Sequence, residues 1–220
     1  MSIDLSQFEL QSPIKKGDGI LIIPADKLLE GFTAEYFYYN PDASATFMCP
    51  TNGATTENAK YPRCELRERR EKGEWSLKGS HVLDVACRVN KLAGGKGVII
   101  GQIHGTNSKM YPQLVKLFWR NDNSIMVECR DDKDPTKHVQ HTFGTYKLGE
   151  LINYLISVDG EDVTICINSV GTHTSTRFSF KNKYWTKQKY YFKVGNYLQN
   201  NKGDDLSLVT FSRIRIVHKD

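Results

Sequence analysis

Short β-rich runs separated by turn residues fill most of this 220-residue chain, and this alternation constrains the fold more than any other feature of the sequence. Such punctuation is typical of a sandwich or barrel rather than of alternating βαβ units. Asp159-Gly160 is a tight-hairpin signal, and Gly94-Gly95 separates two further runs. The sequence predicts antiparallel strands at 62–70, 80–89, 97–104, 113–119, 124–130, 137–143, 151–158, 163–168, 173–180, 190–198 and 206–217.

One segment, PADKLLEG at 24–31, is expected to be helical because an acidic residue comes early and a glycine ends it. No repeat, low-complexity tract or linker divides the sequence, so we expect a single domain over residues 1–220. Hydrophobic residues make up 39% and charged residues 25%, which is ordinary for a globular protein. The fold class that fits is all-β: a jelly-roll β-sandwich of two antiparallel sheets.

Composition argues against several classes of protein. No apolar run approaches the roughly 18 residues of a membrane helix, and MSIDLSQFEL lacks the basic and apolar regions of a signal peptide, so we expect no membrane partner. The 30 Lys and Arg against 25 Asp and Glu give a net charge of +5, modest for a nucleic-acid binder. A zinc ribbon, a redox motif and a disulfide framework are disfavoured by five dispersed cysteines without a CxxC pair: Cys49, Cys64, Cys87, Cys129 and Cys166.

The run YPRCELRERR carries a row of alternating charges. Side chains alternate along a strand, so Arg63, Glu65 and Arg67 share one face, and Cys64 and Leu66 share the other. One interpretation is a solvated, mutually neutralised surface. The other is a pair of guanidinium forks, oriented by the carboxylate between them, that bind an acidic ligand.

The run GVIIGQIHG is expected to place Gln102 and His104 side by side. A lone histidine in a strand is more often structural, but an amide donor beside an imidazole suits proton transfer next to a carboxylate. Strict alternation would add Val98 and Ile100 to this face and put Ile99, Gly101 and Ile103 on the other.

The run YYFKVGNYLQNN puts Tyr191, Lys193, Gly195 and Tyr197 on one face of a strand. Aromatic side chains in strands usually pack against a core or a sheet surface. Tyr197 differs because it shares its face with a lysine. A nearby cation stabilises the phenolate and so lowers the phenol pKa below its usual value of about 10. Tyr197 is therefore a candidate proton donor or acceptor.

RCELRE, GQIHG and YFKVGNY resemble, in order, the three signature blocks of the alginate lyases of polysaccharide lyase family seven. Those blocks read R-(S/T)-E-L-R, Q-(I/V)-H and Y-F-K-x-G-x-Y, so Cys64 is the one mismatch. LSQFELQSPI and PQLVKLFW are similar to two further strands of the family. Cys64 faces away from the arginines, so we expect it to affect packing rather than chemistry. The resemblance implies a jelly roll with its cleft on the concave sheet.

The resemblance further implies cleavage of the 1,4-glycosidic bonds of alginate by β-elimination, with no metal and no organic cofactor. Arg63 and Gln102, with His104, would neutralise the uronate carboxylate. Tyr197 would protonate the departing O4. In guluronate, His104 would take the C5 proton; in mannuronate, Tyr197 would act as both base and acid.

Substrate positioning is implied for a set of residues around these blocks: Glu65, Arg67, Tyr191, Lys193, Asn196, Gln199 and Asn201. In the family, isoleucine between the glutamine and the histidine tends to accompany activity on guluronate-containing blocks, and Ile103 stands there. The implied partner is an acidic polysaccharide, alginate, which a monomer would degrade as a secreted or periplasmic protein. No nucleic-acid partner is expected.

Other functions remain open at this point. The same basic face could belong to a non-catalytic polyuronate-binding module, or to a lyase of another polyuronate such as glucuronan. A glycoside hydrolase would need two carboxylates flanking the bond, but no E-x-D-x-(x)-E motif is present and Glu65 stands between arginines.

The remaining polar groups are expected to be structural or solvated. Asp131 to Asp134 should form a turn rather than a calcium site. A basic rim that attracts a polyuronate, rather than a nucleic-acid surface, is expected of Lys181, Lys183, Lys187 and Lys189. Structural or surface positions are expected for His81, His138, His141, His173 and His218.

Overall fold

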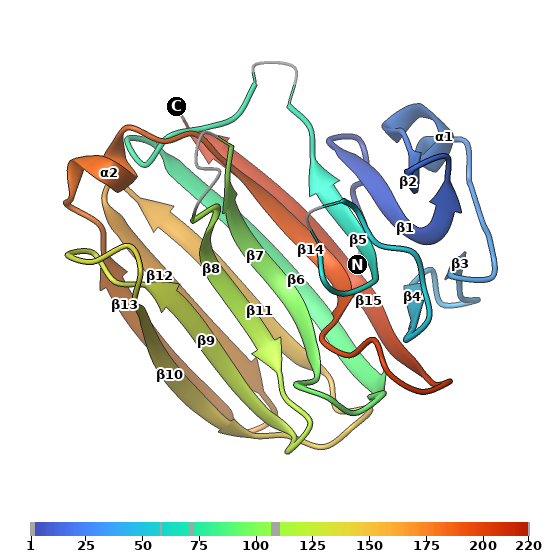
Figure 1. Ribbon diagram of the computed structural model, residues 1–220. Helices are drawn as coiled ribbons and strands as arrows, with labels where there is room; N and C mark the ends of the chain where they lie inside the picture. Colours follow the sequence, from blue (N-terminus) through green and yellow to red (C-terminus); the bar gives the residue numbers. More distant parts are fainter. Residues whose placement is uncertain (1–2, 58, 71–72, 107–110, 220) are drawn as a thin grey trace.

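The computed structural model describes residues 3–57, 59–70, 73–106 and 111–219. Two antiparallel β-sheets lie face to face, and Figure 1 shows how the strands of one cross in front of the other. The sandwich of two antiparallel sheets predicted from the punctuation is confirmed.

Within the described residues, the first sheet has eight strands, namely β1 (Phe8–Lys16), β2 (Gly19–Ile23), β5 (Arg63–Glu68), β7 (Val98–Gly105), β8 (Gln113–Trp119), β9 (Ser124–Arg130), β10 (His138–Thr145) and β14 (Tyr190–Leu198). Their order across the sheet is β10-β9-β8-β7-β14-β5-β1-β2. The described part of the second sheet has seven strands, namely β3 (Phe37–Tyr39), β4 (Ala45–Pro50), β6 (Ser80–Lys91), β11 (Ile152–Asp159), β12 (Asp162–Ser169), β13 (Thr172–Ser179) and β15 (Leu206–Lys219). These lie in the order β13-β12-β11-β6-β15-β4-β3.

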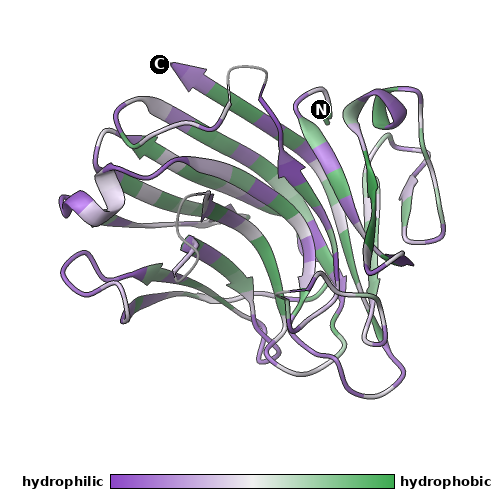
Figure 2. Cartoon of the chain, turned by 45° about the horizontal axis from the view of Figure 1, so that its top comes forward, coloured by the Kyte–Doolittle hydropathy of each residue, from purple (hydrophilic) through white to green (hydrophobic). Residues whose placement is uncertain are grey.

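Alternating hydrophobicity places the core between the sheets. In β11, for example, Ile152, Tyr154, Ile156 and Val158 are fully buried while the residues between them are partly exposed. Figure 2 shows the same banding along the curved strands. Each fully buried aliphatic or aromatic side chain contributes about 1.5–3 kcal/mol relative to an exposed one, so the two inner faces hold the sheets together.

The predicted strands are confirmed with their ends shifted by no more than two residues, and Asp159-Gly160 forms the hairpin between β11 and β12. The prediction omits β2, β3 and β4, and β1 was expected only from the resemblance. β3 has three residues, too few for a readable period, and the apolar run of β2 does not alternate.

In the part of the chain that the structure describes, two short helices accompany the sheets. The expected helix is confirmed as α1 (Ala25–Leu29), whereas α2 (Lys183–Thr186) was not predicted. Four residues are too few for a helical period, but Asn182 is a readable cap, because its side chain accepts a hydrogen bond from the Tyr184 backbone N–H. No helix in the described ranges is long and apolar enough to span a bilayer.

All five cysteines are free thiols. Cys49, Cys64, Cys87 and Cys129 are buried and Cys166 is partly exposed. The thiol of Cys64 lies in the core and contacts the carbonyl oxygen of Tyr36 at 3.2 Å, which confirms that Cys64 faces away from the arginines of β5.

Sheet order brings the three sequence blocks together. β14 lies between β7 and β5, so segments at 63–68, 98–105 and 190–198 become neighbours. The register sets Lys193 opposite Gln102 on one side and Arg67 on the other. Tyr197 pairs with Arg63, and Tyr191 with His104.

Candidate active site

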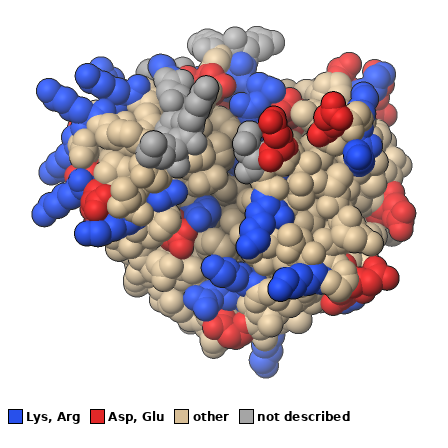
Figure 3. Space-filling view, viewed as in Figure 1, with Lys and Arg blue, Asp and Glu red and all other residues tan. Residues whose placement is uncertain are grey.

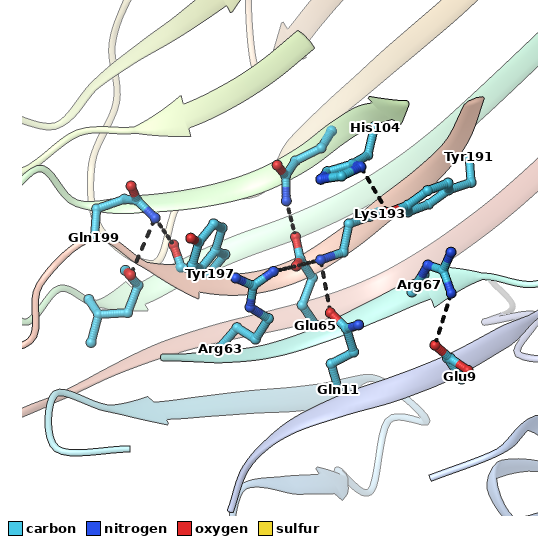
Figure 4. A network of polar contacts seen from close by, with 12 residues as sticks. Glu9, Gln11, Arg63, Glu65, Arg67, His104, Tyr191, Lys193, Tyr197 and Gln199 are labelled. Atoms are coloured by element: carbon cyan, nitrogen blue, oxygen red, sulfur yellow. Dashed lines mark hydrogen bonds and ion pairs between the residues drawn. The ribbon is translucent and has the colours of Figure 1, made fainter. Parts of the chain in front are cut away.

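Polar side chains from β5, β7 and β14 meet on the outer face of the first sheet (Figure 4). The four residues predicted to be catalytic are among them: Arg63, Gln102, His104 and Tyr197. Basic side chains surround a hollow in the middle of this face (Figure 3). The inner face of the same strands carries the apolar core residues Leu66, Ile103 and Phe192.

A buried carboxylate organises the cluster. Glu65 has no exposed surface. One of its oxygens accepts a hydrogen bond from Gln102 Nε2 at 2.5 Å, and the other lies 2.5 Å from Lys193 Nζ and 3.5 Å from Arg63 Nη1. Arg63 is only 9% exposed, so the interpretation of this row as a solvated surface is wrong. A buried charge persists only when it is paired and hydrogen-bonded, and Glu65 is both.

Arg67 points away from that carboxylate. Its guanidinium lies 3.5 Å from Glu9 and 3.8 Å from Glu74, and its central carbon lies 4.2 Å from the centroid of the Tyr191 ring. The expectation that one carboxylate orients both arginines is therefore wrong for Arg67, which Glu9 on β1 holds instead.

Strand β1 also supplies Gln11, whose side-chain oxygen accepts a hydrogen bond of 2.9 Å from Lys193 Nζ. Sequence reasoning missed Glu9 and Gln11. The available signal was their spacing of two within a strand, which puts both on one face, but the pairing of β1 with β5 is not readable from local pattern.

His104 is held at one ring nitrogen. Nδ1 lies 2.9 Å from the carbonyl oxygen of Gly105 and 2.8 Å from the hydroxyl oxygen of Tyr191. Burial, reinforced by the charges of Lys193 and nearby arginines, lowers the pKa of His104 to about 3. The ring is consequently neutral at neutral pH and has the protonation state that a general base requires.

The phenol of Tyr197 lies under a cation. The guanidinium carbon of Arg63 is 3.9 Å from the ring centroid, a cation–π distance. Burial raises the pKa of Tyr197, and the opposing charge of Arg63 does not cancel that effect. The expectation that a neighbouring lysine would favour the phenolate is wrong, because desolvation dominates and Tyr197 stays a phenol at neutral pH.

A bulge in β7 changes which residues share the outer face. Register shifts between Ile99 and Gly101, so strict alternation fails there. Val98 and Ile100 lie in the main core, whereas Ile99 lies on the outer face in a small apolar cluster that also includes Phe118, Met126 and Tyr197. Ile103 faces the core, as expected.

The predicted positioning residues are spread over different environments. Lys193 is 2% exposed and burial lowers its pKa. Asn196 is turned into the core, where its amide donates to the carbonyl oxygens of Phe47 and Ser207 at 3.0 Å. The expectation that Asn196 contacts substrate is wrong, because its side chain is directed into the core, on the opposite face from that of its neighbour Tyr197.

The two residues expected to follow β14 differ in their distance from the cluster. Gln199 contacts the Tyr197 carbonyl oxygen at 3.3 Å and stays beside the cluster. Asn201 is exposed and donates to the carbonyl oxygen of Lys60 at 3.2 Å. Among the described residues, no hydrogen bond joins Asn201 to the catalytic candidates.

Two hollows flank the cluster along β14. One is lined by Lys96, Lys116, Phe118, Arg120, Met126, Glu128, Gln140 and Gln199. The other, at the opposite end of the strand, is lined by Glu68, Arg69, Arg70, Gly73, Glu74 and Tyr191. Basic side chains line both, so the surface suits an extended anionic chain that passes over the cluster.

A second buried polar cluster lies behind the first. Nδ1 of His81 lies 2.8 Å from Nδ1 of His218, whose Nε2 lies 2.7 Å from Glu68. Glu68 also accepts hydrogen bonds from the Trp75 indole at 3.0 Å and the Phe192 backbone N–H at 2.7 Å. These contacts confirm the structural interpretation of both histidines. The hydrogen bond from the Phe192 N–H also holds β14 at the position between Tyr191 and Lys193.

The remaining polar segments are at the surface. Asp131 accepts hydrogen bonds from the backbone N–H groups of Lys133 and Asp134, which confirms the expected turn. The lysines around α2 are exposed. The ring of His138 is partly exposed, and its Nε2 lies 3.6 Å from a carboxylate oxygen of Glu128. Within the described ranges, no three His, Cys, Asp or Glu side chains form a potential metal-binding group.

Comparison with known proteins agrees with this geometry. The family model described as alginate lyase matches residues 3–218. A curated alginate lyase of Klebsiella pneumoniae is 27% identical over 98% of this chain and 89% of its own length.

Among solved structures, alginate lyase A1-II', a member of polysaccharide lyase family 7, superposes with a TM-score of 0.88 at 30% identity, covering 99% of this chain and 97% of its own. A variant of A1-II' has been solved in complex with substrate (GGMG); it superposes with a TM-score of 0.87 at 30% identity, covering 98% of this chain and 94% of that one. Alginate lyase PA1167 from Pseudomonas aeruginosa gives a TM-score of 0.85 at 29% identity, with 98% and 100% coverage. With the three blocks adjacent on one sheet and the match spanning nearly the whole sequence, this chain belongs to the alginate lyases of polysaccharide lyase family 7.

Proposed function

We propose that this chain cleaves the 1,4-glycosidic bonds of alginate by β-elimination and leaves 4,5-unsaturated uronate ends. The observation that carries the proposal is the convergence of Arg63, Gln102, His104 and Tyr197 on one face of the first sheet. The substrate complex of A1-II' supports alginate as the polymer.

The chemical difficulty is the C5 proton, which is barely acidic because its removal adds negative charge next to a carboxylate. In this proposal Arg63 and the second amide hydrogen of Gln102 neutralise that carboxylate, and the contacts of both side chains with Glu65 support these roles. Donors that are already oriented toward developing charge commonly supply the largest catalytic contribution, and the loss of one typically costs about 10² to 10³ in rate.

For guluronate, the C5 proton and O4 lie on opposite sides of the sugar. His104 takes the C5 proton, the C5–H electrons form the C4=C5 double bond, the C4–O4 bond breaks, and the Tyr197 hydroxyl protonates O4. Both residues start in the required form, because His104 is neutral and Tyr197 is a phenol.

For mannuronate, the C5 proton and O4 lie on one side, so Tyr197 takes the proton and returns it to O4. That route starts from the phenolate, which burial disfavours. The protonation states of His104 and Tyr197 therefore support a preference for guluronate-containing blocks. Because Ile103 is buried in the core, it affects this preference only indirectly, through the backbone of β7.

Positioning roles follow from the same geometry. Glu65 and Lys193 hold the catalytic side chains from beneath the surface. Gln199 lines one hollow, and Arg67 contacts Tyr191 and Glu74, which line the other. We further propose that residues 1–220 form one catalytic domain, which works as a monomer on polymer outside the cell, without a cofactor.

Ultraviolet absorbance of the conjugated 4,5-unsaturated uronate tests the proposal, measured in parallel on polyguluronate, polymannuronate and glucuronan with a chelator present. A rise on an alginate block establishes β-elimination and the block preference together. A rise on glucuronan alone would assign a different polyuronate. Binding of the polymers without any rise would establish a non-catalytic binding module.

A further inference from the structure

His104 has two partners at one ring nitrogen, and they require different proton positions. Nδ1 lies 2.9 Å from the Gly105 carbonyl oxygen and 2.8 Å from the Tyr191 hydroxyl oxygen. A carbonyl oxygen only accepts, so the first hydrogen bond requires a hydrogen on Nδ1. A phenol also donates, so the second forms with a bare Nδ1. Neutral His104 therefore has a partner in place for each of its two tautomers.

Tyr191 is fixed in the position that this exchange requires. It is 8% exposed, and its ring lies 5.0 Å from the His104 ring at an interplanar angle of 29°. The guanidinium carbon of Arg67 lies 4.2 Å from the centroid of the Tyr191 ring. Burial raises the pKa of Tyr191, so its hydroxyl keeps the proton that it donates.

The other ring nitrogen is the one left for substrate. No hydrogen bond within the described ranges involves Nε2 of His104, whereas both contacts of the ring use Nδ1. Whatever occupies Nδ1 therefore decides what Nε2 offers, because a neutral imidazole carries one hydrogen.

We propose that Tyr191 is a positioning residue that selects the tautomer of His104 and thereby sets the relative rates on the two uronate epimers. With Nδ1–H donating to the Gly105 carbonyl, Nε2 has a lone pair and accepts the C5 proton of guluronate. With the Tyr191 hydroxyl donating to Nδ1, Nε2–H donates to the uronate carboxylate, the role that mannuronate needs while Tyr197 moves the proton. This inference rests on the proposed lyase function.

Tyr191→Phe tests the selection and keeps the ring that stacks on His104. The variant leaves Gly105 as the partner of Nδ1, so Nε2 loses its hydrogen. We expect kcat/KM on polymannuronate to fall at least about tenfold more than kcat/KM on polyguluronate, since a lost donor to developing charge costs about 10² to 10³. Tyr38→Phe, on the other sheet, is the matched control and should leave the ratio unchanged. Equal losses on both polymers, or a larger loss on polyguluronate, would overturn the proposal.

Nitrogen-15 NMR of histidine-labelled protein reads the tautomer without turnover. The His104 resonances are assigned by their loss in His104→Asn. We expect contributions from both tautomers in the wild type and Nδ1–H alone in Tyr191→Phe. The same single tautomer in both proteins would contradict the proposal. If the wild type degrades neither polymer, the lyase function fails, whereas the NMR result still decides the role of Tyr191.

Discussion

At the scale of single residues, Tyr197 separates chemistry from binding. In the proposed mechanism its hydroxyl supplies the proton for O4, while its ring packs against Arg63 and a small apolar cluster. Tyr197→Phe keeps the ring, so we expect turnover to fall by about 10² to 10⁴ or more, the range of general acid–base catalysis, with polymer affinity retained. Initial rates and equilibrium binding measure the two effects. Tyr38→Phe is the control, and near-normal turnover in Tyr197→Phe would remove the phenol from the mechanism.

The protonation state of the same phenol predicts opposite pH behaviour on the two polymers. In the proposed mechanism mannuronate cleavage needs the Tyr197 phenolate, whose population grows as the pH rises toward the raised pKa of Tyr197, whereas guluronate cleavage needs the phenol. The ratio of the polymannuronate rate to the polyguluronate rate should therefore increase with pH between about 6 and 9, by up to about tenfold per unit. Initial rates at constant ionic strength check this, and parallel profiles would disprove it.

Residue types could be predicted from the sequence, but their environments could not. The resemblance of the three blocks implied Arg63, Gln102, His104 and Tyr197, and alternation, which is local, indicated which residues of a block share a face. The partners Glu9 and Gln11 depend on β1 pairing with β5, which is a long-range contact. The pKa direction of Tyr197 depends on desolvation, which no linear pattern reveals.

At the scale of elements, the close approach of β14 to β5 depends on Gly195. Its φ is +154°, and a Cβ there would lie 2.6 Å from the Glu65 Cα and 2.7 Å from the Cys64 carbonyl oxygen. Gly195→Ala should therefore push the two strands apart, destabilise the fold by about 1–3 kcal/mol and lower turnover because Glu65 moves. Denaturant unfolding and initial rates measure both effects. Gly19→Ala, with open space around its Cβ, is the control; equal stability of the two variants would contradict this account.

Element boundaries were predictable where strands are long and alternate, as in β6 and β11, and failed where they are short, as in β3. Face assignment failed at the bulge of β7, because one inserted residue reverses the alternation beyond it. The order of the strands within each sheet was not predicted, because pairing between distant segments leaves no local pattern in the sequence.

At the scale of the whole molecule, His104 links the site to stability. Its pKa is about 3 in the folded state against 6.5 in a model peptide, so between these values the unfolded chain binds more protons. The contribution of His104 is complete above pH 6.5 and is lost as the pH falls, by at most about 1.4 kcal/mol per unit. Denaturant unfolding from pH 7 to 4 should therefore show a steeper loss for the wild type than for His104→Asn. Parallel losses would contradict the prediction.

Because most of the cysteines are buried, the rate of their alkylation measures how often the sandwich opens. Cys166 is partly exposed, whereas Cys49, Cys64, Cys87 and Cys129 are shielded, and burial raises the pKa of Cys49 to about 12. Alkylation requires the thiolate and access to it, so Cys166 should be modified first and the others only at the rate at which the sandwich opens. Mass spectrometry of pulse-labelled protein would then time the separation of the sheets, with Cys64 reporting on strand β5 beneath the arginines and Cys87 on the opposite layer. Fast labelling of all five would show that the layers part readily.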